Sequence, residues 1–425
     1  MHLPLMVPVR QQFPAAVVQD PVAAVRQQLE QTGLAAKVKP GARIAVSSGS
    51  RGVANIAAIT RAVIDAIGQA GGRPFILPAM GSHGGANVEG QREVLAGYGI
   101  SEATMGVPVE ATMEVVQVDT LDDGTPVLVN RLALEADGVV LVNRVKPHTS
   151  FRGRFESGLM KMMTIGLGSH RGATIAHAHG AQGLARLIPA WGKVILRRAP
   201  ILMGVALIEN AYEQTARVVA LRPEEFEERE PALLEEARRA MPRLLVHGID
   251  LLIVERIGKD ISGTGMDTNV IGRMMLPGIP EPEEPGIARI VALDLTDKTH
   301  GNANGVGLAD IVTRRLFERI DLKATYANVF TTTFLNRANI PVIMETDREA
   351  VEGALRVLHL EDPSQARIVR IANTLELARI EISEPLFNRF RDRPDLGQDG
   401  ESRPLTFGPD GALRPGEPSR RLAAR

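Results

Sequence analysis

The sequence predicts an α/β fold with two α/β domains and mostly parallel sheets. Strand-like and helix-like segments alternate along the chain, and this alternation is typical of parallel strands with helices covering the sheet. The strand-like segments are short apolar runs, as expected for strands buried on both faces. The chain has 425 residues, which is more than a single hydrophobic core usually organises.

The first domain is expected to contain alternating elements at short spacing. In chain order these are a strand at Arg43–Ser48, a helix at Ala54–Ala70, a strand at Arg73–Pro78, a helix at Asn87–Tyr98, a strand at Gly138–Asn143, a helix at Pro223–Met241 and a strand at Ile249–Glu255. The second of these has the apolar spacing of one helix face, and Gly71 and Gly72 end it.

A second α/β set follows a change of domain near residues 257–262. Strands are expected at Ile287–Leu293, Ile340–Met344 and Ile368–Ile371, and helices around Ala309–Glu318 and Asp347–Val357. From Arg391 the chain is rich in Pro, Gly, Arg and Asp, which favours an extended or partly disordered tail. The expected domains are therefore residues 1–257 and 258–390, followed by a tail at 391–425.

Composition excludes several classes of function. The formal net charge is -1 and only 4% of residues are aromatic, which argues against a nucleic-acid or anionic-membrane partner. No cysteine is present, so disulfides, thiolate catalysis and protein-ligated iron–sulfur clusters are excluded. No basic leader and no apolar run of membrane-spanning length is found. A cytoplasmic location is therefore the expectation.

Three loops that follow strands carry the polar residues expected to bind a ligand. The first, Ser47-Ser48-Gly49-Ser50-Arg51-Gly52, offers free amides to an anion and a guanidinium to a carboxylate or phosphate. The second contains Gly81-Ser82-His83, and the third ends at His148. Ligands bind at the carboxyl ends of strands in open α/β sheets. Each loop has a plainer reading, as an ordinary turn or an exposed loop histidine.

The segment from Val145 to His179 holds four of the nine histidines: His148, His170, His177 and His179. Histidine is suited to metal ligation and to proton transfer near neutral pH. Lys161 lies in the same segment, where the only acidic residue between Gly153 and Gly168 is Glu156. A solvated lysine beside methionines is the alternative reading. In the second domain, Lys298 and His300 lie in an Asn-rich loop that could close over an acidic substrate, or could be a capped loop.

Taken together, these segments resemble the nickel-pincer nucleotide-dependent lactate racemase family of 2-hydroxy-acid racemases and epimerases. The resemblance runs from about Arg43 to Glu345 and is strongest between Val139 and Gly180 and at Gly81-Ser82-His83. It implies a site in the cleft between two α/β domains. The implied cofactor is nickel pyridinium-3-thioamide-5-thiocarboxylate mononucleotide, made by separate maturation enzymes. The implied substrate is a small 2-hydroxy acid.

The resemblance also implies roles for individual residues. Lys161 matches the lysine that tethers the cofactor, and His177 matches the nickel ligand. His83 and His148 match the two acid/base histidines, and Arg51 matches the residue that grips the substrate carboxylate. Ser48, in the same loop as Arg51, is expected to contact the cofactor.

Some positions depart from the lactate-specific pattern. Gly272 and Met275 stand where those members have Gln and Lys, so another 2-hydroxy acid is indicated, and Arg273 is expected to supply the charge. Two alternatives stay open from the residues alone. One is a zinc metallohydrolase using His170, His177 and His179, against which the lack of a nearby carboxylate base counts. The other is a non-catalytic protein that binds the nickel cofactor.

Overall fold

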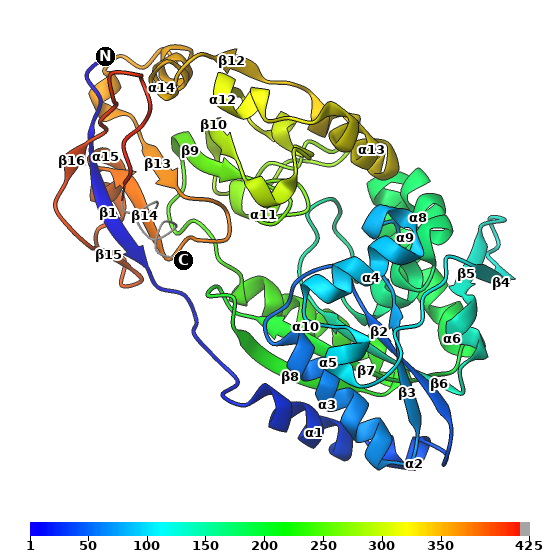
Figure 1. Cartoon of the computed structure of the whole chain (residues 1–425). Coiled ribbons are helices and arrows are strands. Elements are labelled where there is room, and N and C mark those ends of the chain that lie inside the picture. The colour runs from blue at the N-terminus through cyan, green and yellow to red at the C-terminus, as the bar shows by residue number, and fades with distance from the viewer. Residues whose placement is uncertain (417–425) are drawn as a thin grey trace. The chain divides into compact units, whose positions relative to one another are not determined.

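The computed structural model describes residues 1–416, and its contacts divide the chain into two compact units. The N-terminal unit comprises residues 15–241. The C-terminal unit comprises residues 1–14 and 242 onward. Both units combine helices with sheets (Figure 1), and the sheet is mostly parallel in the N-terminal unit and mixed in the C-terminal unit. The expected α/β class is confirmed.

The N-terminal unit is built on a five-stranded sheet in the order β3-β2-β6-β7-β8. Its strands are β2 (Arg43–Ser48), β3 (Arg73–Pro78), β6 (Gly138–Arg144), β7 (Ile201–Glu209) and β8 (Thr215–Leu221). Only β8 runs antiparallel to its neighbour. A separate two-stranded ladder pairs β4 (Val115–Thr120) with β5 (Pro126–Asn130).

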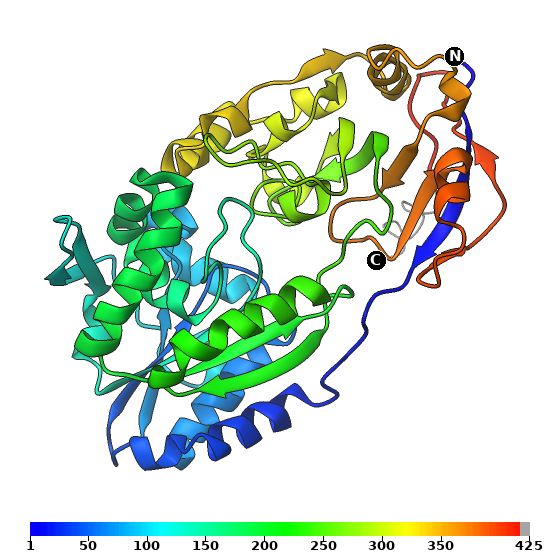
Figure 2. The ribbon, with the colours of Figure 1, turned by 180° about the vertical axis from the view of Figure 1, so that it is seen from behind.

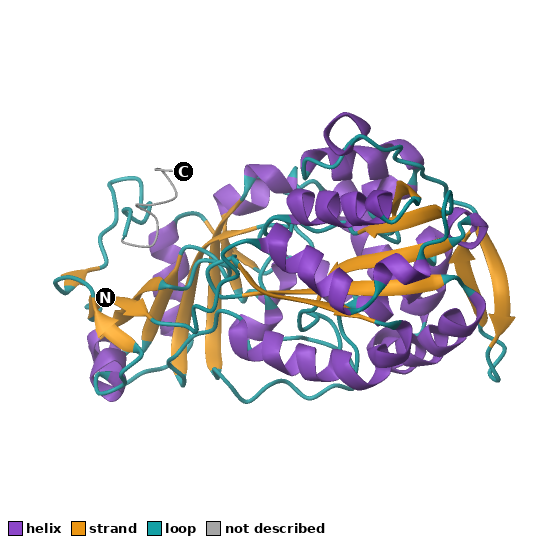
Figure 3. Ribbon diagram, turned by 90° about the horizontal axis from the view of Figure 1, so that it is seen from below, coloured by secondary structure: helices purple, strands orange, loops and turns teal. Residues whose placement is uncertain are grey.

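Helices cover both faces of this sheet, which is on the right in Figure 3. They are α1 (Pro21–Gln31), α2 (Leu34–Lys37), α3 (Ile56–Gln69), α4 (Val88–Gly97), α5 (Glu102–Met105), α6 (Arg131–Glu135), α7 (Leu159–Lys161), α8 (Ser169–Ala178), α9 (Gly180–Arg198) and α10 (Phe226–Ala240). A π-helical turn, Met162–Gly166, continues α7 toward α8.

Each face of the sheet has its own packing partners. One face joins α1 and α3 in a continuous apolar core that includes Val25, Ile59 and Val140. On the other face, α7 and α10 contact β7, and α10 lies along the green strands in Figure 2. Gly204 of β7 makes this approach possible, because a Cβ there would lie 2.5 Å from Leu159 and 2.7 Å from Phe226. The α7 turn is therefore seated directly on the sheet.

The C-terminal unit contains a larger mixed sheet in the order β12-β11-β10-β9-β13-β14-β1-β15, with β16 also paired to β1. Its strands are β1 (Leu5–Gln11), β9 (Ile249–Ile257), β10 (Ile287–Leu295), β11 (Ile311–Thr313), β12 (Val342–Met344), β13 (Ile368–Ile371), β14 (Arg379–Ser383), β15 (Leu396–Gln398) and β16 (Arg403–Pro404). Its helices are α11 (Thr268–Ile271), α12 (Arg314–Glu318), α13 (Leu322–Thr332), α14 (Asp347–Arg356) and α15 (Glu384–Phe390).

The units differ from the expected domains at three places. The division falls between Met241 and Pro242 rather than after residue 257, because β9 is a central strand of the larger sheet. The first 14 residues join that sheet through β1. Residues 396–398 and 403–404 of the expected tail pair with β1, and residues 417–425 lie outside the described part.

One expected helix was wrong in its first half. The segment 309–318 was expected to be a single helix, but Ile311–Thr313 forms β11 and only Arg314–Glu318 is helical. These three residues are β-branched; all three pair with β12, and Ile311 and Val312 also pair with β10. Sheet pairing therefore overrides the helical reading of this short apolar run.

Candidate active site

Three loops of the N-terminal unit follow neighbouring parallel strands. The loop with Ser48 and Arg51 follows β2, the loop with His83 follows β3, and the loop with His148 follows β6. Because β2 lies between β3 and β6 and all three run parallel, these loops leave the same edge of the sheet. The two histidine loops therefore flank the loop that carries Arg51, as the sequence predicted.

Lys161 ends the α7 turn, and its side-chain amine is an unusually weak base for a lysine. Burial and the nearby charge of Arg51 lower the pKa of Lys161 to about 7, while Glu156 acts in the opposite direction. The Lys161 ammonium lies 5.8 Å from the centre of the Phe151 ring. A substantial neutral fraction at neutral pH makes this amine a competent nucleophile.

His177 lies on α8 and remains neutral at neutral pH. Burial and the charge of Lys161 lower the pKa of His177 to about 4. A neutral imidazole is the form that ligates a metal. The electrostatic effect of Lys161 on His177 also places the two side chains in one region, whereas His170 and His179 are exposed.

The Nδ1 atoms of His83 and His148 have opposite hydrogen-bonding roles. His83 is exposed, and its Nδ1 lies 3.0 Å from the Met80 carbonyl oxygen, which can only accept. The hydrogen is therefore on Nδ1, and Nε2 of His83 carries the lone pair. The half-buried His148 accepts a hydrogen bond at Nδ1 from the Ser150 amide at 3.0 Å, so its neutral ring carries hydrogen on Nε2.

The loop that carries His148 is organised by Glu156, whose carboxyl is 1% exposed. It accepts hydrogen bonds from the His148 amide at 2.7 Å, the Gly153 amide at 3.3 Å and Arg238 of α10 at 3.1 Å. Burial raises the pKa of Glu156, and these donors and Arg152 oppose the shift. The tight turn around one buried carboxyl fixes the backbone on which His148 stands.

A second buried carboxyl, Glu230 of α10, lies at the start of the α7 turn. It accepts from the Met160 amide at 3.0 Å and also from the Leu159 amide. Burial raises the pKa of Glu230 to about 8. Sequence reasoning missed Glu230, because nothing distinguishes it among the seven neighbouring charged residues of its helix.

Ser48 and Arg51 share the loop after β2 but differ in environment. Ser48 is buried, and its carbonyl accepts from the Ala79 amide at 2.8 Å, which ties the β2 and β3 loops together. Arg51 is exposed. The adjacent Ser50 carbonyl accepts from the Tyr98 hydroxyl at 3.0 Å. Arg51 is thus presented from an anchored loop and can reach a ligand.

The substrate residues expected from the second domain lie in the C-terminal unit. Arg273 pairs with Asp310 at 2.8 Å and donates to the Leu308 carbonyl at 3.0 Å, so its guanidinium is engaged within the unit. Lys298 and His300 are exposed on the turn after β10. Their contacts with a substrate remain predictions.

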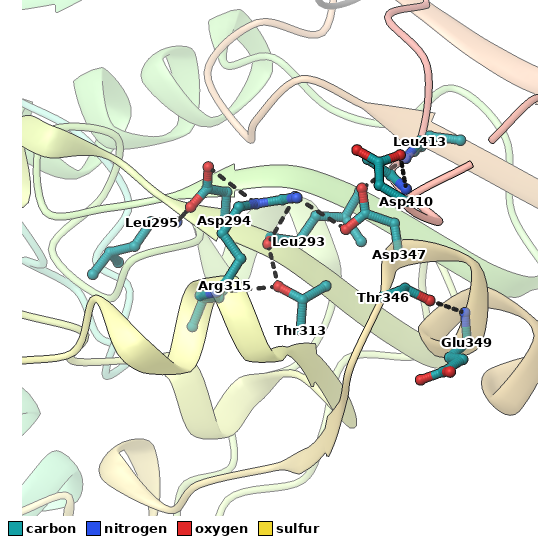
Figure 4. A network of polar contacts seen from close by, with 12 residues as sticks. Leu293, Asp294, Leu295, Thr313, Arg315, Thr346, Asp347, Glu349, Asp410 and Leu413 are labelled. Carbon is teal, nitrogen blue, oxygen red and sulfur yellow. Dashed lines mark hydrogen bonds and ion pairs between the residues drawn. The ribbon is translucent and has the colours of Figure 1, made fainter. Parts of the chain in front are cut away.

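Next to that turn, an ion-pair network joins the ends of β10, α12 and α14 (Figure 4). Arg315 lies between Asp294, at 3.5 Å, and Asp347, at 3.0 Å. Asp294 also pairs with Arg319 at 2.9 Å. The network fixes the base of the loop that carries Lys298 and His300.

The residues present fit a metal-bearing cofactor better than a metal held by the protein alone. Within residues 1–416, no group of three or more His, Asp or Glu side chains is placed to hold a metal ion. The zinc alternative expected such a group from His170, His177 and His179, and the structure does not arrange these three side chains as one. Lys161 and His177 supply one amine and one neutral imidazole in the same region, and their roles toward a cofactor remain predictions.

Comparison with known proteins is consistent with these features. Residues 6–186 match the family described as the lactate racemase N-terminal domain. The structure is similar in fold to the lactate racemase apoprotein from Thermoanaerobacterium thermosaccharolyticum, with a TM-score of 0.52 and 14% identity. The similarity covers 86% of this chain and 94% of that chain. No curated protein sequence matches the chain. No helix in residues 1–416 is both long and apolar enough to cross a membrane.

Proposed function

We propose that the chain is a racemase or epimerase that inverts C2 of a small 2-hydroxy acid, because residues 6–186 match the family described as the lactate racemase N-terminal domain. The observation that carries this proposal is the pair of histidines on the two sides of the Arg51 loop, whose Nδ1 atoms have opposite hydrogen-bonding roles. Inversion needs proton transfer at both faces of the substrate, and two differently prepared imidazoles supply it.

In this proposal Lys161 and His177 hold the nickel-pincer nucleotide, the lysine covalently and the histidine through its neutral ring. The chemistry that this cofactor supplies when bound is reversible acceptance of hydride from C2. The amine of Lys161 is suited to acylation because its pKa of about 7 leaves much of it neutral. Ser48, at the end of β2, lines the cofactor.

Arg51 binds the substrate carboxylate and orients C2 between His83 and His148. His83, with its lone pair on Nε2, takes the hydroxyl proton as C2 is oxidised. His148 first donates a hydrogen bond from Nε2 to the substrate oxygen. It then takes a proton from solvent at Nδ1, and in the return step it transfers the Nε2 proton to that oxygen. That protonation displaces the Ser150 amide from Nδ1. For the other enantiomer the two histidines exchange roles.

The first experiment is the intact mass and nickel content of the protein produced together with cofactor-maturation enzymes. We expect an adduct on Lys161 with about one nickel per chain, and no adduct on Lys161→Ala. An unmodified wild-type chain under competent maturation would refute the cofactor assignment.

Activity is then tested on separate enantiomers of a panel of 2-hydroxy acids. His83→Ala and His148→Ala should each lose at least about a hundredfold in turnover while keeping nickel. His170→Ala, an exposed histidine on α8, is the matched control and should keep wild-type turnover. Loaded protein that inverts no 2-hydroxy acid would favour the alternative of a non-catalytic cofactor-binding protein.

A further inference from the structure

The buried carboxyl of Glu230 meets the first turn of the helix that carries Lys161. The first amides of a helix have no acceptor within the helix itself. Here the amides of Leu159 and Met160 donate to Glu230, the latter at 3.0 Å, although 70 residues separate Met160 from Glu230. Glu230 is 1% exposed, so this contact is shielded from water.

The chain before this turn is shaped to admit the carboxyl. A Cβ on Gly158 would lie 2.3 Å from the Glu230 Oε1 atom and 3.3 Å from a methyl group of Val145. Only glycine therefore lets the backbone pass over Glu230. The Gly158 carbonyl in turn accepts from the Asn143 side-chain amide at 2.7 Å, which ties this point to the end of β6.

A buried carboxyl is costly unless its hydrogen bonds are good. Among the described residues, no arginine, lysine or histidine forms a salt bridge with Glu230. Its polar contacts within residues 1–416 are with the two amides at the start of α7. A role confined to packing would be served as well by leucine, so these contacts indicate a different purpose.

We infer that Glu230 is a positioning residue for Lys161: by accepting hydrogen bonds from the Leu159 and Met160 amides, it fixes the helical turn that directs the lysine. Met160 immediately precedes Lys161, so any loosening of this turn reorients the lysine directly. The importance of Lys161 for catalysis rests on the proposed function. The positioning itself is a property of the chain without cofactor.

The test compares three single variants in the protein without cofactor. Glu230→Leu removes the acceptor, Glu230→Gln retains a carbonyl acceptor, and Glu228→Leu is a control at an exposed position on the same helix. Hydrogen exchange of a peptide spanning 159–166 reports the turn. Acylation of Lys161 by acetic anhydride, followed by mass spectrometry as a function of pH, reports the lysine.

We expect amide exchange in this peptide to accelerate on the order of tenfold or more in Glu230→Leu. The acylation midpoint of Lys161 should rise by about one pH unit or more, because a loosened turn exposes the amine to water. Glu230→Gln and Glu228→Leu should resemble wild type in both measurements. A folded Glu230→Leu with unchanged exchange and acylation would overturn the inference, as would Glu230→Gln behaving like Glu230→Leu.

If Glu230→Leu does not fold, Gly158→Ala tests the same contact from the other side. Its added methyl would displace the carboxyl, so both readouts should move as predicted for the leucine variant. Unchanged readouts in folded Gly158→Ala would overturn the inference. These measurements need no cofactor, so their failure is separable from a failure to find the adduct on Lys161.

Discussion

Replacing Glu230 by Gln should change how the stability of the N-terminal unit depends on pH. Burial raises the pKa of Glu230 to about 8, against about 4.3 for an ordinary glutamate. Between these values the folded chain keeps a proton that the unfolded chain has released. The free energy of unfolding of wild type therefore falls with rising pH, by about 1.4 kcal/mol per unit from this group.

Glutamine cannot ionise, so the free energy of unfolding of Glu230→Gln does not show this decrease with rising pH. From pH 5 to pH 8 its stability relative to wild type should increase by about 4 kcal/mol, which is three pH units at that slope. Lys161 and His177 also have shifted pKa values, but these shifts come from burial, Arg51, Glu156 and Lys161 and not from Glu230. Their contributions are common to both proteins and cancel in the difference.

The assay is urea unfolding at several pH values, followed by the fluorescence of Trp191. This is the single tryptophan of the chain, and it is buried on α9 in the same unit as Glu230. Glu228→Gln, exposed on the same helix, should show no pH-dependent difference from wild type. If the curves for Glu230→Gln and wild type ran parallel from pH 5 to pH 8, the carboxyl would not be buried as described.

Three other changes have definite expected outcomes. Glu156→Ala should destabilise the N-terminal unit by about 3 kcal/mol, because partly buried donors lose their buried acceptor. Chemical denaturation measures this, and a loss under about 0.5 kcal/mol, typical of a surface site, would contradict it. The acylation midpoint of Lys161 should lie near pH 7 and should rise in Arg51→Ala, since a like charge is removed; an unmoved midpoint would show that the two charges do not interact. Gly204→Ala should cost about 1–3 kcal/mol, because its Cβ would lie 2.5 Å from Leu159, and a neutral effect on the denaturation midpoint would argue against the close seating of α7.

The sequence predicted best those parts of the fold that depend on local pattern. The strands Arg43–Ser48, Arg73–Pro78 and Ile368–Ile371 were predicted with the bounds found for β2, β3 and β13. Parallel strands buried on both faces appear as short apolar runs, which local inspection can detect. The common sheet edge of the three candidate loops followed from the same alternation.

Features that depend on distant contacts could not be predicted in this way. The division between units follows the pairing of β9 with β10 and β13 rather than a change in composition. The candidate site shows the same limit, since the histidines and Lys161 lie in recognisable motifs but Glu230 does not. Its significance comes from a contact with the Met160 amide that no local pattern encodes.

The place of β1 bears on how the chain can fold during synthesis. Met6 pairs with Ser383, and Val9 pairs with Gln398, so β1 is synthesised more than 350 residues before the strands that pair with it. Residues 15–241 are contiguous and can fold as they emerge. Until those strands have been synthesised, the amides and carbonyls of β1 lack their sheet partners, and β1 can associate with strands of other chains.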